Sequence, residues 1–161
     1  MKKSDVALIV GALLVIILSI FALSNNKEKI ERPVVLSDNF AEIKNIKYTD
    51  YKQMLDENKT FVIIIVRDGC TYCEQFMPVV KEVVEEKKTP IYSIDIATLE
   101  QDEIEEFQKS NSYLKNKEWG TPTTLVLRGS DVIDSLSGYT EKKKFIEFLD
   151  KNVKLPDEKK D

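Results

Sequence analysis

Residues 61–73 read FVIIIVRDGCTYC, and they decide the fold. Phe61–Val66 is a continuous apolar, β-branched run, which is typical of a central strand covered on both faces of its sheet. A short turn containing Gly69 follows. From Cys70 to about Lys88, valines and Phe76 recur on one side of a helical pattern. The stretch therefore predicts a strand, a turn and a helix that begins at the first of two cysteines.

The same alternation of strand and helix patterns continues on either side of this stretch. Further strands are predicted at residues 43–48, from 90 onward (IYSIDIA), 123–127 and 132–139, the last two joined by a turn at 129–131. For the first of these, a helix with Phe40, Ile43 and Ile46 on one face is the alternative. Further helices are predicted from Thr49, as N-cap, to about Glu57, from about Leu99 with Ile104, Phe107 and Leu114 on its apolar side, and after Thr140, again as N-cap. The order βαβαβαββα predicts an α/β fold, with a mixed sheet and helices on both faces.

Composition excludes several classes of function. The 161 residues have room for one compact domain and a short appendage. A net charge of −4, with Lys and Glu interleaved along the chain, argues against nucleic-acid binding, because neutralising phosphates needs a basic face. There is no histidine, which excludes Ser/His or Cys/His catalysis and histidine metal sites. No cofactor is predicted.

The two cysteines of the chain, Cys70 and Cys73, carry the strongest functional signal. Two thiols without histidine cannot complete a structural zinc site, and a disulfide across so short a loop adds little stability. Residues i and i+3 share a helical face, and a helix start favours the thiolate that acts in disulfide exchange. We therefore predict that Cys70, exposed at the helix start, is the nucleophile, and that Cys73, one turn inside and less exposed, resolves the mixed disulfide.

With these residues in view, the segment Phe61–Phe148 resembles the thioredoxin superfamily. Pro78, five residues after Cys73, is similar to the proline inside the first long helix of thioredoxins. Gly120–Thr123 (GTPT) resembles the loop that carries a cis-proline opposite the cysteines. The resemblance implies a thioredoxin-like fold, a cis Thr121–Pro122 bond, and substrate binding by Thr121 and Pro122 through strand-like backbone pairing. Thr71 and Tyr72, between the cysteines, are further candidates for substrate binding; for an exposed Tyr72 the alternative is that it contacts nothing.

The chain departs from the thioredoxin pattern in three places. Gly69 stands where thioredoxins usually carry Trp, and Ile64 stands at the position of their buried acidic residue. The Thr71–Tyr72 pair is closer to glutaredoxins and periplasmic disulfide isomerases than to thioredoxins. Within the superfamily, the N-terminal apolar run, RDGCTYC and GTPTT together resemble small membrane-anchored proteins that include the bacteriocin transport accessory group. Trp119, just before the loop, is interpreted as a packing residue.

The N-terminal apolar run predicts a membrane anchor. Residues 6–23, VALIVGALLVIILSIFAL, contain no charge and as a helix rise about 27 Å, close to the ~30 Å hydrocarbon core of a bilayer. The alternative is a cleaved signal peptide, whose apolar region is usually shorter. We predict a cytoplasmic tail at 1–5, a transmembrane helix at 6–23, a tether at 24–38, a thioredoxin-like domain at 39–155 outside the cytoplasmic membrane, and a charged tail at 156–161.

Together these features predict a membrane-anchored thiol–disulfide oxidoreductase that acts on the disulfides of exported or cell-surface proteins and peptides. An unidentified redox partner would reset the cysteines, and the direction of electron flow stays open because it depends on the potential. One alternative is a non-catalytic accessory protein of a peptide or bacteriocin export system, which would use the fold only for docking. Another is a Cu(I) carrier, which a lone pair of thiolates disfavours. The sequence indicates neither the substrate nor an oligomeric state.

Overall fold

The computed structural model describes residues 30–116 and 118–156. Its contacts divide the chain into Met1–Ile30 and Glu31–Asp161, and the description below concerns the second unit. The predicted anchor at 6–23 lies outside the described residues. Among the helices that are described, none combines the length and the apolar character needed to cross a bilayer.

A five-stranded mixed sheet forms the centre of the domain, in the order β2-β4-β3-β5-β6. Its strands are β2 (Ile43–Asn45), β3 (Thr60–Val66), β4 (Ile91–Asp95), β5 (Thr123–Arg128) and β6 (Asp131–Ser137). Strands β2, β4 and β3 run parallel to one another, whereas β5 pairs antiparallel with both of its neighbours, β3 and β6. The apolar run that suggested a covered strand is the central one, and Thr60 to Ile65 are buried throughout.

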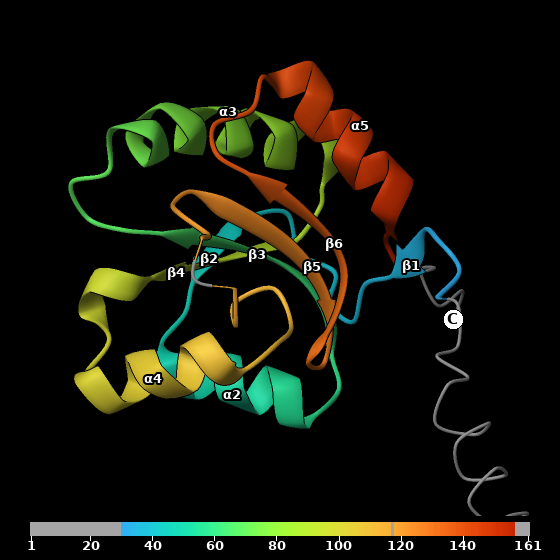
Figure 1. Cartoon of the computed structure of the whole chain (residues 1–161). Coiled ribbons are helices and arrows are strands. Elements are labelled where there is room, and N and C mark those ends of the chain that lie inside the picture. Colours follow the sequence, from blue (N-terminus) through green and yellow to red (C-terminus); the bar gives the residue numbers. More distant parts are fainter. Residues whose placement is uncertain (1–29, 117, 157–161) are drawn as a thin grey trace, which may run out of the picture. The chain divides into compact units, whose positions relative to one another are not determined.

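Helices cover both faces of this sheet, as Figure 1 shows. Helices α2 and α4 lie on one face and α3 and α5 on the other, while a short 3₁₀ helix, η1, follows β4. Their bounds are α2 (Tyr48–Asp56), α3 (Thr71–Lys87), η1 (Ile96–Thr98), α4 (Gln101–Lys109) and α5 (Lys142–Asn152). The predicted α/β class, with a mixed sheet and helices on both faces, is confirmed. The predicted N-caps Thr49 and Thr140 are wrong, because the caps are Lys47 and Glu141.

The alternation of side chains along β3 divides the core into two layers. Phe61, Ile63 and Ile65 point to one face, where they pack with residues of α2 and α4 such as Tyr51 and Phe107. Val62 and Ile64 therefore point to the opposite face, which α3 and α5 cover. That layer includes Phe76 of α3 and Phe145 of α5, whose rings meet edge to face at 5.1 Å. Buried apolar contacts thus join the N-terminal half of α3 to α5 on this face of the sheet.

Part of the segment predicted as a tether packs on the domain instead. Strand β1 (Val34–Val35) pairs in parallel with β7 (Val153–Lys154), and the side chains of Val34 and Leu36 are buried. Arg32 adds hydrogen bonds to Asp134 at 2.8 Å and to Asn152 at 3.0 Å. The prediction of a tether is therefore wrong for this part of 24–38. This part of the chain packs beside β7 and the end of α5.

Candidate functional site

A tight turn between β3 and α3 sets the position of Cys70. The Cys70 amide donates a 3.2 Å hydrogen bond to the carbonyl of Arg67, which closes a four-residue turn. Gly69, in the third place of this turn, has φ +71°. Only glycine adopts that region without a steric cost, so this backbone accounts for glycine where thioredoxins usually carry Trp.

Cys70 and Cys73 are joined as a disulfide across the first turn of α3, with their Cα atoms 5.2 Å apart. Cys70 is the N-cap residue of the helix, and the Cys73 amide donates a 3.2 Å hydrogen bond to the Cys70 sulfur. An amide that donates to sulfur at a helix N-terminus stabilises a negative charge there. The helix start therefore favours the thiolate of Cys70 whenever the disulfide is open.

The two sulfurs differ in access from outside. Cys70 is 9% exposed and Cys73 is 5% exposed. Both cysteines are therefore buried, and the prediction that Cys70 is exposed is wrong. Cys70 nevertheless lines an open cleft, and Cys73 does not. A substrate sulfur in the cleft can approach Cys70, whereas Cys73 can react with Cys70 from within the protein.

The Gly120–Thr123 loop faces the Cys70 sulfur from the neighbouring strand. The Thr121–Pro122 bond is cis, as the resemblance implied. The loop is held by a 2.6 Å hydrogen bond from the Thr123 hydroxyl to the Gly120 carbonyl, and by a 2.8 Å bond from the Gly138 amide to the Pro122 carbonyl. The Thr121 carbonyl oxygen lies 3.4 Å from the Cys70 sulfur. The structure thus brings Cys70, Thr121 and Pro122 together.

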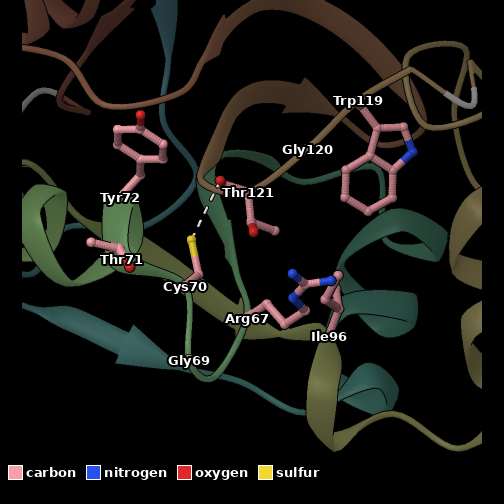
Figure 2. A pocket seen from close by; sticks show the side chains of 9 residues that line it. All are labelled: Arg67, Gly69, Cys70, Thr71, Tyr72, Ile96, Trp119, Gly120 and Thr121. Atoms are coloured by element: carbon pink, nitrogen blue, oxygen red, sulfur yellow. Dashed lines mark hydrogen bonds between the residues drawn. The ribbon is translucent and has the colours of Figure 1, made fainter.

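The cleft beside the disulfide has a volume of about 430 Å³. Figure 2 shows that Thr71 and Tyr72 stand on one side of Cys70, and that Arg67, Ile96 and Trp119 stand on the other. Tyr72 is 64% exposed and has the open position expected of a residue that meets a partner. The predicted residues Thr71, Tyr72 and Thr121 all line the cleft, whereas Pro122 is buried and does not line it.

Five of the nine lining residues were not predicted as part of the site, and three of these five are residues other than glycine. Ile96 begins η1, Trp119 precedes the cis-proline loop, and Arg67 is the one charged residue among the nine that line the cleft. The Trp119 indole donates a 3.1 Å hydrogen bond to the Leu114 carbonyl and packs at 6.4 Å from the ring of Phe107. Trp119 is therefore the packing residue that the sequence indicated, and its ring also forms a wall of the cleft.

A smaller apolar pocket adjoins the cleft on this side. Ile96 and Trp119 line both spaces, and Leu99, Ile104, Phe107 and Gln108 complete the pocket, whose volume is about 50 Å³. No group of three or more potential metal-ligating side chains occurs within the described part of the chain. The reactive groups at this site are two sulfurs that can close on each other, which form a two-electron couple.

Comparisons with known proteins agree with this arrangement. The model of the thioredoxin-like domain family matches residues 48–152. The solved thioredoxin of Aeropyrum pernix is similar over 74% of this chain and 94% of its own, with 17% identity and a TM-score of 0.52. Thioredoxin f from spinach chloroplast is similar over 70% of this chain and 95% of its own, with 14% identity and a TM-score of 0.52. These likenesses show the fold, and the family match covers both cysteines and the cis-proline loop. The chain belongs to the thioredoxin-like domain family.

Proposed function

We propose that this protein is a membrane-anchored thiol–disulfide oxidoreductase, with Cys70 as the nucleophile and Cys73 as the resolving thiol. The observation that carries the proposal is the Cys70–Cys73 disulfide at the start of α3, with Cys70 alone of the two lining an open cleft. A disulfide that served only stability would gain little from a loop this short. Its place beside a cleft is what exchange chemistry requires.

The reaction proceeds by two exchanges of sulfur partners. In the reducing direction, the Cys70 thiolate attacks one sulfur of a substrate disulfide, and the other substrate sulfur leaves as a thiolate. Cys73, having given up its proton to solvent, then attacks the Cys70 sulfur. The Cys70–Cys73 bond forms, and the bond from Cys70 to the substrate breaks. Two electrons and two protons pass to the substrate in total, and oxidation of a substrate dithiol is the same sequence reversed.

The shape of the cleft favours a polypeptide as the substrate. Thr121 and Pro122 are proposed to hold an extended peptide, with the Thr121 backbone adding it as a short strand beside Cys70. Thr71 and Tyr72 are proposed to contact it at the helix start. The cleft wall formed by Ile96 and Trp119 continues into the small apolar pocket, which offers a place for an apolar side chain near the substrate cysteine.

We further propose that residues 6–23 anchor the chain in the cytoplasmic membrane, with the domain outside it. The support is the uncharged apolar length of that segment. In that place the site would meet disulfides of exported or cell-surface proteins and peptides, and a separate redox partner would reset the cysteines. Protease treatment of intact and permeabilised cells tests the orientation. Digestion of the domain in intact cells supports it, and digestion only after permeabilisation contradicts it.

The proposed activity is tested with the full-length chain in detergent, mixed with a disulfide-bonded peptide in a glutathione buffer. We expect catalytic amounts of the protein to speed the exchange of the peptide disulfide well beyond the rate in buffer alone. An unchanged rate at every glutathione ratio would remove the proposal.

Trp119 supplies a prediction about how the substrate binds. We expect Trp119→Ala to raise the KM for a peptide disulfide about tenfold, the equivalent of ~1.4 kcal/mol, because the aromatic wall of the cleft is lost. The rate with hydroxyethyl disulfide, which is too small to reach that wall, should stay within about twofold of the parent rate, since the sulfurs are untouched. Steady-state kinetics with both substrates measure the two effects.

The matched variant is Trp119→Phe, which keeps an aromatic ring at the wall. It should retain most of the affinity for the peptide. Equal losses with both substrates would indicate that Trp119 acts only through stability, and would contradict its role in binding.

A further inference from the structure

One buried hydroxyl group in the domain has no hydrogen-bond partner. Thr124 is 1% exposed. Among the buried side-chain oxygens and nitrogens of the described residues, its Oγ1 is the one that has no hydrogen-bond partner. Its neighbour Thr123 is also buried, but the hydroxyl of Thr123 donates to the Gly120 carbonyl at 2.6 Å. An unpaired buried hydroxyl destabilises the state in which it occurs, and that state here is the disulfide form.

The sheet register places Thr124 on the face that α3 covers. Thr124 on β5 is directly opposite Ile64 on β3, and directly opposed residues point to the same face. Ile64 points away from the layer of Ile63 and Ile65, and so toward α3 and α5.

Thr124 also lies near the beginning of α3. Figure 1 shows that the chain leaves the end of β3, turns, and runs back over the sheet as α3. Ile64 is close to that end of β3, and the register puts Thr124 beside it. Cys73 is the buried residue in the first turn of the helix above. Thr124 and Cys73 therefore lie on the same face of the sheet, at the end where α3 begins.

The other polar neighbour of Ile64 is already engaged. Ser93 on β4 is opposite Ile64 on the other side, and its hydroxyl donates to the Asn45 side chain at 2.6 Å. Ile64 itself has no polar atom on its side chain. Among the buried residues of this row of the sheet, Thr124 is the one whose hydroxyl is left as a donor.

We propose that the Thr124 hydroxyl donates a hydrogen bond to the Cys73 sulfur when the disulfide opens, directly or through one water molecule. In the disulfide, the Cys73 sulfur is bonded to Cys70; after opening it is free to accept the donor. Thr124 is thus a positioning residue for Cys73, which carries the negative charge both as attacking thiolate and as leaving group. The inference rests on the proposed function and adds to it a group that stabilises the open, reduced form.

The test is Thr124→Val in the full-length chain, which removes the hydroxyl and keeps the shape. We expect the oxidised variant to unfold at a higher denaturant concentration than the parent, and the reduced variant to show no such gain. The equilibrium constant for reduction of Cys70–Cys73 by glutathione should fall about tenfold, which corresponds to a potential about 30 mV more negative. Thr124→Ser, which restores the hydroxyl, should return the constant to within about twofold of the parent value.

Ser93→Ala is the matched control, because it removes a hydroxyl that is paired on the opposite side of Ile64. It should lower the stability of both forms alike and leave the equilibrium constant unchanged. Should Thr124→Val fail to fold, Thr124→Ala gives the same comparison.

Two results would overturn the inference. If a bound water satisfies Thr124 in both forms, Thr124→Val will change the two stabilities equally and leave the equilibrium constant unaltered. If Thr124→Ser fails to restore the constant, shape and not the hydroxyl is responsible. A parent protein whose disulfide does not exchange with glutathione would instead refute the proposed function, so the two failures are distinct.

Discussion

Cys73→Ser should accumulate as a covalent mixed disulfide with its substrate. In this variant Cys70 remains the N-cap of α3, still lines the cleft and still accepts a hydrogen bond from the amide of residue 73. Its first attack on the substrate disulfide should therefore proceed within about twofold of the parent rate. A serine hydroxyl at position 73 cannot displace the substrate sulfur, because it is not ionised at neutral pH. Turnover should fall to the rate in buffer alone. Mass spectrometry of the full-length chain after acid quenching measures the trapped adduct.

Cys70→Ser should form no adduct and should not turn over, because the sulfur that lines the cleft is gone. The pair of variants thereby separates the two cysteines. An adduct on Cys73 in the Cys70→Ser variant would show that the assignment of Cys70 as the nucleophile is wrong. In cells, a Cys70→Ser chain that retained the full phenotype of the parent would favour the accessory, non-catalytic role.

Phe107→Ala should lower the free energy of unfolding by about 3–5 kcal/mol, a large part of the ~5–15 kcal/mol typical of such a domain. Phe107 is 1% exposed and joins α4 to the sheet, with its ring centroid 5.0 Å from that of Tyr51 and 6.4 Å from that of Trp119. Truncation leaves a cavity that these rings cannot fill without moving. Urea unfolding followed by circular dichroism gives the change from the shift in midpoint.

Lys109→Ala is the control for this change, since it alters an exposed residue of the same helix. It should shift stability by no more than about 0.5 kcal/mol. A loss below about 1 kcal/mol in Phe107→Ala would mean that α4 does not share the core of the sheet as the structure indicates.

The fold was predictable wherever a local pattern decides it. The unbroken apolar run at 61–66 predicts a covered strand, and it differs from β3 by the addition of Thr60 alone. The short strands β1 and β7 were missed because they pair with each other from opposite ends of the domain's sequence, with Val34 beside Val153. Two residues in each strand leave no periodic pattern to read.

The end of α4 shows a second kind of limit. Leu114 suits the apolar side of a longer helix, yet α4 ends at Lys109. The Asn111 side chain accepts hydrogen bonds from the backbone amides of Tyr113 and Leu114, at 3.0 Å and 2.9 Å. Side-chain bonds of this kind offer the backbone an alternative to the helix. Leu114 is buried all the same, so its apolar character was informative and its secondary structure was not.

The candidate site was predictable as a motif and not as a cleft. The sequence shows the spacing of Cys70 and Cys73 and the GTPT loop. In the structure these two features are the disulfide and the cis-proline loop that faces it. Ile96 and Trp119 lie far from the cysteines along the chain, and only the packing of η1 and of the loop brings them to the cleft. The unpaired hydroxyl of Thr124 is likewise a property of the register, which no local pattern reports.

A redox titration of the full-length chain shows whether Cys70 and Cys73 exchange reversibly between disulfide and dithiol. The protein is equilibrated with glutathione buffers of graded ratio, the free thiols are alkylated after acid quenching, and the oxidised fraction is read by mass. We expect one reversible two-electron transition of the Cys70–Cys73 pair, with a midpoint between about −120 and −300 mV, the range spanned by proteins that exchange disulfides. A pair that stays fully oxidised or fully reduced in the folded protein at every ratio would contradict the account.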